Sequence, residues 1–197
     1  LVHSEINTNV DAGSGTGILG LFALRSGADK CYFLEQNPYA LAFSKKVIQK
    51  YGFEAQSVFL EGDATEVDLP ETFDLLISET LTAGFVAEDF PKIINHLRIF
   101  RQPHSIFIPE AFSVSVTEKD AQYQTLAEHQ FYFRSQAGFQ KNKLLLVSPT
   151  KTIAHLVWRS EAFLYQQKTL QSGDCLSFLN QRKTRPQDFH PLFEIQS

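Results

Sequence analysis

Methionine is absent from this 197-residue sequence, including at position 1, although 18 phenylalanines show that large apolar side chains are abundant. Methionine is an ordinary filler of protein cores. We therefore expect that a segment upstream of residue 1 is missing and that internal methionines are missing as well. A spacing between two residues can then be short by one position.

Cysteine is scarce too. The sequence has two cysteines, Cys31 and Cys175, which are too few for a disulfide framework or a cysteine-rich zinc site. No metal site is expected on this basis. Cys31 lies inside an apolar run, so we expect it to be buried as ordinary core packing.

Positive charge is not in excess, since 18 lysines and arginines face 22 acidic residues and the formal net charge is −4. Domains that bind nucleic acid usually carry a basic patch, so no nucleic-acid partner is expected, whereas a basic protein or peptide substrate is compatible with this balance. No apolar run has the length of a membrane span, and no signal-peptide pattern opens the sequence. These absences predict a soluble, cytoplasmic protein without a membrane partner.

A glycine-rich octet, Val-Asp-Ala-Gly-Ser-Gly-Thr-Gly, occupies residues 10–17, and apolar residues at helical spacing follow from Ile18. A strand, a glycine loop and a helix in this order bring a ligand close to backbone N–H groups and to a helix N-terminus. A dinucleotide fingerprint, Gly-x-Gly-x-x-Gly, that starts at Gly13 needs glycine at position 18. Ile18 stands there instead, so the spacing argues against a dinucleotide-binding loop.

Further apolar runs end close to acidic residues. Lys30–Leu34 precedes Glu35, Ser57–Leu60 precedes Asp63, and Phe73–Ser78 precedes Glu79, with a helix expected at Pro38–Tyr51 between the first two runs. Because parallel strands carry their ligands at the carboxyl edge of the sheet, we expect these acidic residues to lie at one edge.

The pattern Asp-x-Gly-x-Gly-x-Gly at residues 11–17 resembles motif I of the class I S-adenosylmethionine-dependent methyltransferases. The resemblance implies a Rossmann-like α/β sheet, with the glycine loop under the methionine part of S-adenosylmethionine. Glu35 would accept hydrogen bonds from the ribose diol, and Asp63 would bind the adenine amino group. The cofactor-binding residues implied in this way are Asp11, Gly13, Ser14, Gly15, Gly17, Glu35, Asp63 and Ala64.

Several of these residues also admit a plainer interpretation. Asp11 can brace the glycine loop from behind, Glu35 can be a solvated carboxylate at a strand end, and Asp63 can be an ordinary turn aspartate.

The hydrophobic pattern changes after Pro109. Before it, apolar strands alternate with helices, including a helix expected at Phe90–Phe100 and a strand at Ser105–Ile108, which is typical of a parallel α/β sheet. After it, short β candidates follow one another, at Ala111–Thr117, Leu144–Val147, Ala154–Trp158, Ala162–Tyr165 and Cys175–Leu179. We therefore expect a methyltransferase domain at residues 1–109 and a smaller, β-rich, barrel-like domain at residues 110–197, with Trp158 and Phe163 in its core.

Residues 78–88, Ser-Glu-Thr-Leu-Thr-Ala-Gly-Phe-Val-Ala-Glu, resemble the double-glutamate hairpin of the protein arginine methyltransferases. The resemblance implies that Glu79 and Glu88 are catalytic and position an arginine guanidinium. A guanidinium stays protonated at ordinary pH, and two carboxylates can grip its planar fork with charge-assisted hydrogen bonds. The implied partner is an arginine-containing protein or peptide, and a homodimer is possible.

Two other functions stay open. The same scaffold can methylate a small molecule, with Glu79 bound to a different polar group, or the chain can be a non-catalytic relative whose β domain mediates assembly. The second is disfavoured because Asp11, the three glycines and Glu35 are all present.

Overall fold

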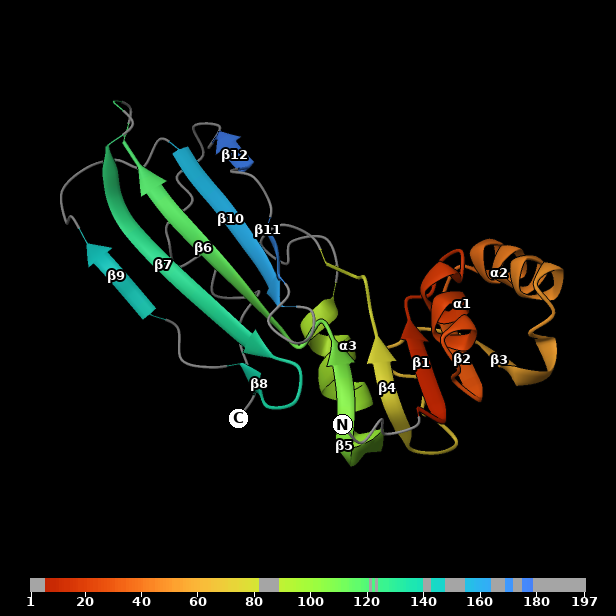
Figure 1. The fold of residues 1–197 in the computed structure, drawn as a ribbon. Coiled ribbons are helices and arrows are strands. Elements are labelled where there is room, and N and C mark those ends of the chain that lie inside the picture. The colour runs from red at the N-terminus through yellow and green to blue at the C-terminus, as the bar shows by residue number, and fades with distance from the viewer. Residues whose placement is uncertain are drawn as a thin grey trace.

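The computed structural model describes residues 6–81, 89–120, 122, 124–139, 143–147, 155–163, 169–171 and 175–178. Two sheets make up most of this part of the chain, and the helix α3 (Phe90–Leu97) lies where they meet (Figure 1). In the described ranges no helix is long and apolar enough to cross a membrane.

The first sheet has five strands in the order β3-β2-β1-β4-β5, and all neighbours in it are parallel. This confirms the Rossmann-like sheet expected from the sequence. The strands are β1 (Thr8–Ala12), β2 (Lys30–Glu35), β3 (Ser57–Glu61), β4 (Phe73–Ile77) and β5 (Arg101–Ile108).

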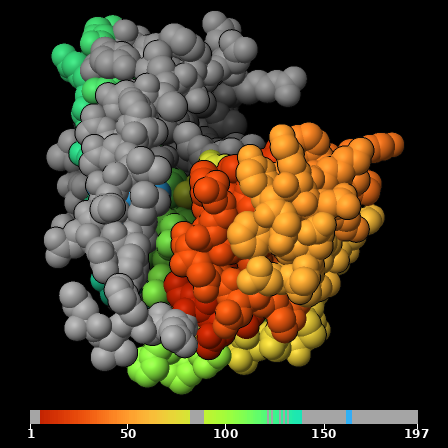
Figure 2. All heavy atoms as spheres, turned by 45° about the vertical axis from the view of Figure 1, so that its right-hand side comes forward, coloured from red at the N-terminus to blue at the C-terminus, as the bar shows by residue number. Residues whose placement is uncertain are grey.

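Two helices cover one face of this sheet, α1 (Ile18–Arg25) and α2 (Pro38–Lys50). Their apolar residues form one cluster with β2, and both helices lie on the same side of the molecule in the space-filling view (Figure 2). A short 3-10 turn, Glu54–Gln56, leads into β3, and another, Arg98–Phe100, follows α3. The predicted helix at Phe90–Phe100 is thus an α-helix that tightens in its last turn.

β1 is short, yet it is the central strand and is buried on both faces. Val10 and Ala12 belong to the cluster that includes α3, whereas Asp11 accepts a hydrogen bond from Gly20 of α1. Gly20 lets α1 lie directly on the sheet, because a Cβ there would collide with the ring of Phe33 and would lie 2.9 Å from the Cys31 Sγ.

Cys31 is fully buried in β2, as predicted. Its Sγ accepts a hydrogen bond of 3.0 Å from the side-chain amide of Asn9, and burial is the main cause that raises the pKa of this thiol. Cys31 therefore acts as core packing.

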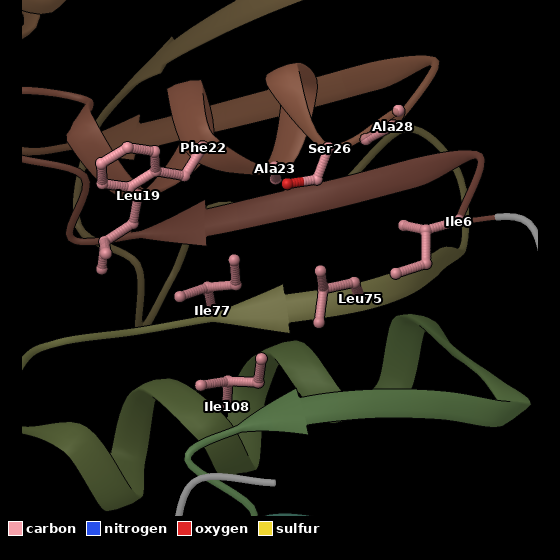
Figure 3. A pocket seen from close by; sticks show the side chains of 10 residues that line it. Ile6, Leu19, Phe22, Ala23, Ser26, Ala28, Leu75, Ile77 and Ile108 are labelled. Carbon is pink, nitrogen blue, oxygen red and sulfur yellow. The ribbon is translucent and has the colours of Figure 1, made fainter.

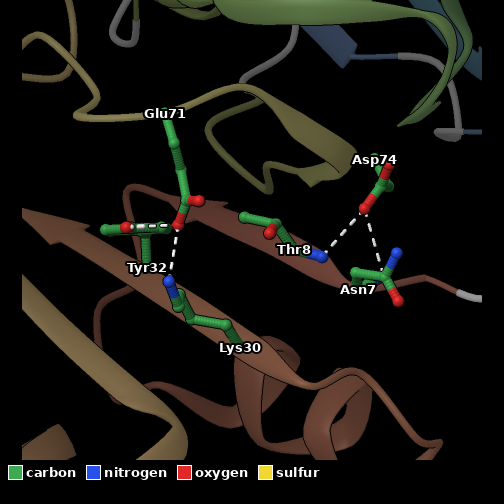
Figure 4. Close-up of polar contacts among 6 residues, drawn as sticks. All are labelled: Asn7, Thr8, Lys30, Tyr32, Glu71 and Asp74. Atoms are coloured by element: carbon green, nitrogen blue, oxygen red, sulfur yellow. Dashed lines mark hydrogen bonds and ion pairs between the residues drawn. The ribbon is translucent and has the colours of Figure 1, made fainter.

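Two carboxylates fasten the amino-terminal edge of the sheet (Figure 4). Glu71 accepts hydrogen bonds of 2.7 Å from Lys30 Nζ and from the Tyr32 hydroxyl, and Asp74 accepts from the backbone N–H of Thr8 at 2.9 Å. The Lys30–Glu71 pair is exposed, so it stabilises the fold little. These contacts fix how the strands start, at the edge opposite to the glycine loop.

The second sheet is antiparallel and has seven strands. Its longest members pair side by side as β10-β6-β7, and β8, β9, β11 and β12 pair with them. The bounds are β6 (Ala111–Lys119), β7 (Thr125–Arg134), β8 (Gly138–Phe139), β9 (Lys143–Val147), β10 (His155–Phe163), β11 (Thr169–Gln171) and β12 (Cys175–Phe178).

The sequence prediction was wrong at two points in this sheet. β10 is one strand, where two strands at Ala154–Trp158 and Ala162–Tyr165 were expected, because it pairs with β6 without a break from Lys119↔His155 to Ala111↔Phe163. β7 was not predicted. The Phe163 ring is half-buried and contacts Tyr132, whereas the side chain of Trp158 lies outside the described residues.

The cores of the two sheets join through α3. Phe90 and Phe133 are fully buried, and their rings meet edge to face with centroids 5.7 Å apart. The Ser135 hydroxyl donates to the carbonyl oxygen of Pro109 at 2.6 Å. We propose that residues 1–109 and 110–197 form two domains, whose described parts meet at this junction.

Candidate functional site

The glycine loop lies between β1 and α1, at the carboxyl edge of the parallel sheet. Gly13, Gly15 and Gly17 have positive φ angles of 71°, 52° and 77°. Side chains other than glycine rarely adopt this conformation, so all three glycines are needed for the path of the loop. Gly17 is also the residue that caps α1.

Backbone hydrogen bonds tie the loop to the end of β2. Ser14 N–H donates to the carbonyl oxygen of Leu34 at 2.8 Å, and Gly15 N–H donates to Glu35 Oε2 at 2.8 Å. The second carboxylate oxygen of Glu35 accepts from the backbone N–H of Asn37 at 2.8 Å. Glu35 is thus half-buried and positioned beside the loop, as the sequence predicted.

Asp11 braces the start of α1 from beneath the loop. Its side chain is 1% exposed, and Oδ2 accepts a hydrogen bond of 2.8 Å from Gly20 N–H. Burial raises the pKa of Asp11 to about 7, the Gly20 N–H opposes this shift, and the charge of Glu35 adds to it. Asp11 therefore braces the segment after the loop through its contact with Gly20. A contribution of Asp11 to cofactor binding stays a prediction.

Two features of the loop fit a ligand. The hydroxyl oxygen of Ser14 is buried and has no hydrogen-bond partner, and buried polar groups normally find one. Among the described residues, and apart from Gly15 and its two chain neighbours, no heavy atom lies within 4 Å of the place where a Cβ on Gly15 would stand. The loop thus offers an unsatisfied polar group beside open space.

Asp63 and Ala64 follow β3. Gly62 N–H donates to the Glu35 carbonyl oxygen at 3.1 Å, which brings this segment next to Glu35. Asp63 is exposed, and its Oδ1 accepts from the backbone N–H and the hydroxyl of Thr65, both at 2.8 Å, which lower its pKa. Ala64 is buried in the core cluster. The turn role of Asp63 is therefore observed, and an adenine contact stays a prediction.

Glu79 lies two residues beyond the end of β4, on the same edge. It is exposed, and the structure gives its carboxylate no hydrogen-bond or ion-pair partner among the described residues. The Ser78 hydroxyl donates to the carbonyl oxygen of Ala12 at 2.9 Å and lies 2.9 Å from the Thr80 hydroxyl. Glu88 lies outside the described residues.

The contacts of Ser78 and Thr80 were not predicted from the sequence. A signal was present, since hydroxyl side chains flank the acidic residue that follows an apolar strand. Ser78 and its partner Ala12 are 66 residues apart in the sequence, so only the parallel pairing of β1 with β4 reveals this contact.

An apolar pocket of about 670 Å³ lies between α1 and the strands β4 and β5 (Figure 3). None of the predicted site residues that the structure describes lines it. Ser26 carries the only hydroxyl among its described lining residues, which therefore lack the converging polar groups of a typical catalytic pocket. Its lining consists of Ile6, Leu19, Phe22, Ala23, Ser26, Gly27, Ala28, Leu75, Ile77 and Ile108.

Comparisons with known proteins agree with this geometry. Residues 10–103 match the family model described as a methyltransferase domain. The histone-arginine methyltransferase CARMER of Drosophila virilis is 29% identical over 100 residues, which cover 51% of this chain and 18% of that protein. The arginine N(omega)-methyltransferase of Streptomyces achromogenes subsp. streptozoticus is 29% identical over 109 residues, covering 53% of this chain and 30% of that protein. The matched part thus spans less than a third of either relative.

A solved structure shares the fold over most of the chain. The Trypanosoma brucei PRMT1 enzyme-prozyme heterotetrameric complex with AdoHcy superposes with a TM-score of 0.67 at 16% identity, covering 89% of this chain and 73% of that chain. The expected class I methyltransferase fold is therefore confirmed, together with the antiparallel sheet that follows it. Residues 10–103 are thus similar to a methyltransferase domain, within the fold of the class I S-adenosylmethionine-dependent enzymes, and the chain resembles the protein arginine methyltransferases.

Proposed function

We propose that this chain transfers a methyl group from S-adenosylmethionine to a guanidinium nitrogen of arginine, either in a protein or peptide or in arginine itself. One observation carries the proposal: Glu79 lies two residues beyond β4, and its two neighbours, Ser78 and Thr80, contact Ala12 at the end of β1 and Gly13 at the start of the glycine loop. The names of the two curated relatives, which both include arginine, support this choice of acceptor.

The residues of the loop fit the proposed cofactor, because Ser14 has an unsatisfied hydroxyl and the space at Gly15 is open. S-adenosylmethionine supplies an electrophilic methyl group on its sulfonium sulfur. We propose that the loop, from Asp11 to Gly17, holds its methionine part. Glu35 would accept from the ribose hydroxyls, and Asp63 and Ala64 would border the adenine.

The role of Glu79 follows from the chemistry of the acceptor. A guanidinium is protonated at neutral pH and is a poor nucleophile. The unpartnered carboxylate of Glu79 can bind two of its N–H groups and draw the positive charge away from the third nitrogen. Glu88 would complete the grip. Orientation and electrostatics would then supply most of the acceleration, and the carboxylates would take the proton that the methylated nitrogen releases.

The partner of the reaction is therefore an arginine-bearing protein, a peptide or free arginine. A homodimer also remains a proposal. The Trypanosoma brucei structure is an enzyme-prozyme heterotetramer. Light scattering at several protein concentrations would measure whether this chain forms a dimer.

A methyl-transfer assay with labelled S-adenosylmethionine tests the proposal. Three acceptors are compared: an arginine-containing peptide, the same peptide with lysine in place of arginine, and free L-arginine. We expect label in methylarginine from the first or the third acceptor and none from the second. Label on lysine, or on a small molecule without a guanidinium, would contradict the arginine proposal and leave the methyltransferase domain in place.

Substitution of Glu79 tests the observation that carries the proposal. Glu79→Gln should slow methyl transfer by about 30-fold or more, since removing one partner of a desolvated charge pair costs about 2–5 kcal/mol. Glu71→Gln is the matched control, because Glu71 lies at the opposite edge of the sheet beside Lys30. Equal rates for the two variants would contradict a role of Glu79 in binding the guanidinium.

A further inference from the structure

Thr80 is connected to the start of the glycine loop through both branches of its side chain, directly by the methyl and through Ser78 by the hydroxyl. Its methyl carbon, Cγ2, fills the space that a Cβ on Gly13 would occupy, so the loop passes directly beneath it. Its hydroxyl lies 2.9 Å from the Ser78 hydroxyl, which reaches Ala12. Ala12 and Gly13 are consecutive, so the methyl contacts, and the hydroxyl reaches through Ser78, the same short segment of the chain.

The direction of the hydroxyl chain follows from the available protons. A serine hydroxyl has one proton, and that of Ser78 is used on the carbonyl oxygen of Ala12, which cannot donate. The Thr80 hydroxyl must therefore donate to Ser78. Consecutive hydrogen bonds of this kind polarise and strengthen one another, and Ser78 is 2% exposed, so water does not replace them easily.

Glu79 stands between these two fastened residues. The backbone of Ser78 is held as well, because its N–H donates to the Ile108 carbonyl oxygen at 2.9 Å. The position of the Glu79 backbone is thus set by contacts to Ala12 of β1 and Ile108 of β5, and Ala12 is the residue directly before the glycine loop.

We infer that Thr80 is a positioning residue that couples the glycine loop to Glu79, its methyl acting on the loop and its hydroxyl, through Ser78, on the backbone that carries the Glu79 carboxylate. The inference rests on the proposed function and deepens it by assigning a residue that links the cofactor side of the site to the acceptor side. Ligand bound at the loop and the orientation of Glu79 then influence each other, and this coupling is reciprocal.

A double-mutant cycle between Gly13 and Thr80 tests the methyl branch, with binding of S-adenosylhomocysteine measured by calorimetry. Gly13→Ala adds a Cβ that meets the Thr80 methyl and also strains a residue with φ of 71°. Thr80→Ser removes only the methyl, so the backbone strain is the same in both backgrounds. We expect Gly13→Ala to weaken binding by at least about 5-fold more in the parent chain than in the Thr80→Ser background.

Equal weakening of binding in the two backgrounds would overturn the coupling of Thr80 to the loop. Absence of S-adenosylhomocysteine binding to the unsubstituted chain is a different outcome, which would contradict the proposed function itself. The two failures are thereby distinguished.

A second comparison tests the hydroxyl branch and does not depend on the fold tolerating Gly13→Ala. Thr80→Val keeps the methyl and loses the donor, so it should bind S-adenosylhomocysteine within about twofold of the parent chain. Its turnover with the arginine acceptor should fall about 10- to 100-fold, because a displacement near 1 Å at a reacting group has effects of this size. Thr80→Ser should recover most of the turnover, since it restores the donor.

The loss in Thr80→Val must act through Glu79 if the inference is right. In the Glu79→Gln background, Thr80→Val should therefore reduce turnover by less than about twofold, since residues that act as a unit are not additive. Thr125→Val, which removes a threonine hydroxyl that accepts from Lys119 in the antiparallel sheet, is the matched control and should leave both binding and turnover unchanged. Additive losses at Thr80 and Glu79, or unchanged turnover in Thr80→Val, would overturn the inference.

Discussion

The Glu35 carboxylate accepts a hydrogen bond of 2.8 Å from the backbone N–H of Gly15, so the acidic end of β2 and the middle of the glycine loop are directly connected. Its other oxygen accepts from Asn37 N–H, at the start of α2. Glu35 therefore organises the loop in addition to its proposed contact with the ribose.

Replacing Glu35 by glutamine should weaken binding of S-adenosylhomocysteine by about 10- to 100-fold, because hydrogen bonds to a charged group contribute about 1.5–3 kcal/mol. Glutamine has one acceptor oxygen where the carboxylate uses two. Glu61→Gln is the control, since Glu61 ends β3 directly beside Glu35 in the sheet register and is exposed. Calorimetric affinities that fall equally in both variants would contradict a specific role for Glu35.

The pH dependence of stability should report Asp11. Its pKa in the folded chain is raised to about 7 from the ordinary aspartate value of 3.8. The folded state therefore binds the proton more tightly than the unfolded state, and ionisation of Asp11 lowers the free energy of unfolding as pH rises from about 4 to 7. The stability that protonation provides is present below pH 4 and is lost by about pH 7.

Asp11→Asn, which cannot ionise, isolates this effect. Urea unfolding of both proteins between pH 5 and pH 8 should show the variant gaining on the parent chain as pH rises, by a few kcal/mol at most. Parallel stability curves across this range would show that Asp11 does not titrate there.

Gly20 should not tolerate alanine, although alanine favours helices by about 1 kcal/mol over glycine. The added Cβ would meet the ring of Phe33, which is fully buried and cannot move aside. We expect a net loss of up to about 2 kcal/mol in the free energy of unfolding, because overpacking typically costs 1–3 kcal/mol and the helix preference of alanine offsets about 1 kcal/mol of it. Phe33→Leu should reduce the penalty of Gly20→Ala, and a Gly20→Ala variant more stable than the parent would contradict the close approach of α1 to β2.

The junction of the two sheets should depend on Phe133. Truncation to alanine removes a fully buried ring that contacts Phe90, and such changes cost about 3–5 kcal/mol. Ile99→Ala, at a side chain that is 66% exposed, should change stability by less than about 0.5 kcal/mol. Chemical denaturation of both variants measures the difference, and similar values would show that Phe133 does not hold the junction.

The parallel sheet could be predicted from sequence because its signals are local. The apolar run at residues 30–34, the glycine spacing and the proline at position 38 each specify an element within a few residues. β7 has no such signal, since Glu128-His129-Gln130 interrupts its alternation, and it forms because it pairs with β6 along its length. Arg159-Ser160-Glu161 likewise divides β10 in the sequence and not in the structure.

The positions of the acidic residues and glycines in the candidate site could be predicted from the sequence, whereas its hydroxyl contacts could not. Glu35 and Glu79 follow apolar runs, so their place at the sheet edge follows from parallel pairing. The bond between Ser78 and Ala12 depends on how two strand ends meet, and the brace from Asp11 to Gly20 depends on how closely α1 approaches the sheet. Such distances are set by tertiary packing.

Calorimetric titration with S-adenosylhomocysteine tests the account most directly. Gly15→Val should abolish binding, since a β-branched side chain is strained at φ of 52° and would enter the open space of the loop. Gly27→Val is the control: it also forces valine into a positive φ, here 105°, but at the far end of α1, and it should bind like the parent chain. Binding of NAD without any binding of S-adenosylhomocysteine, or equal affinity in the two valine variants, would contradict the account.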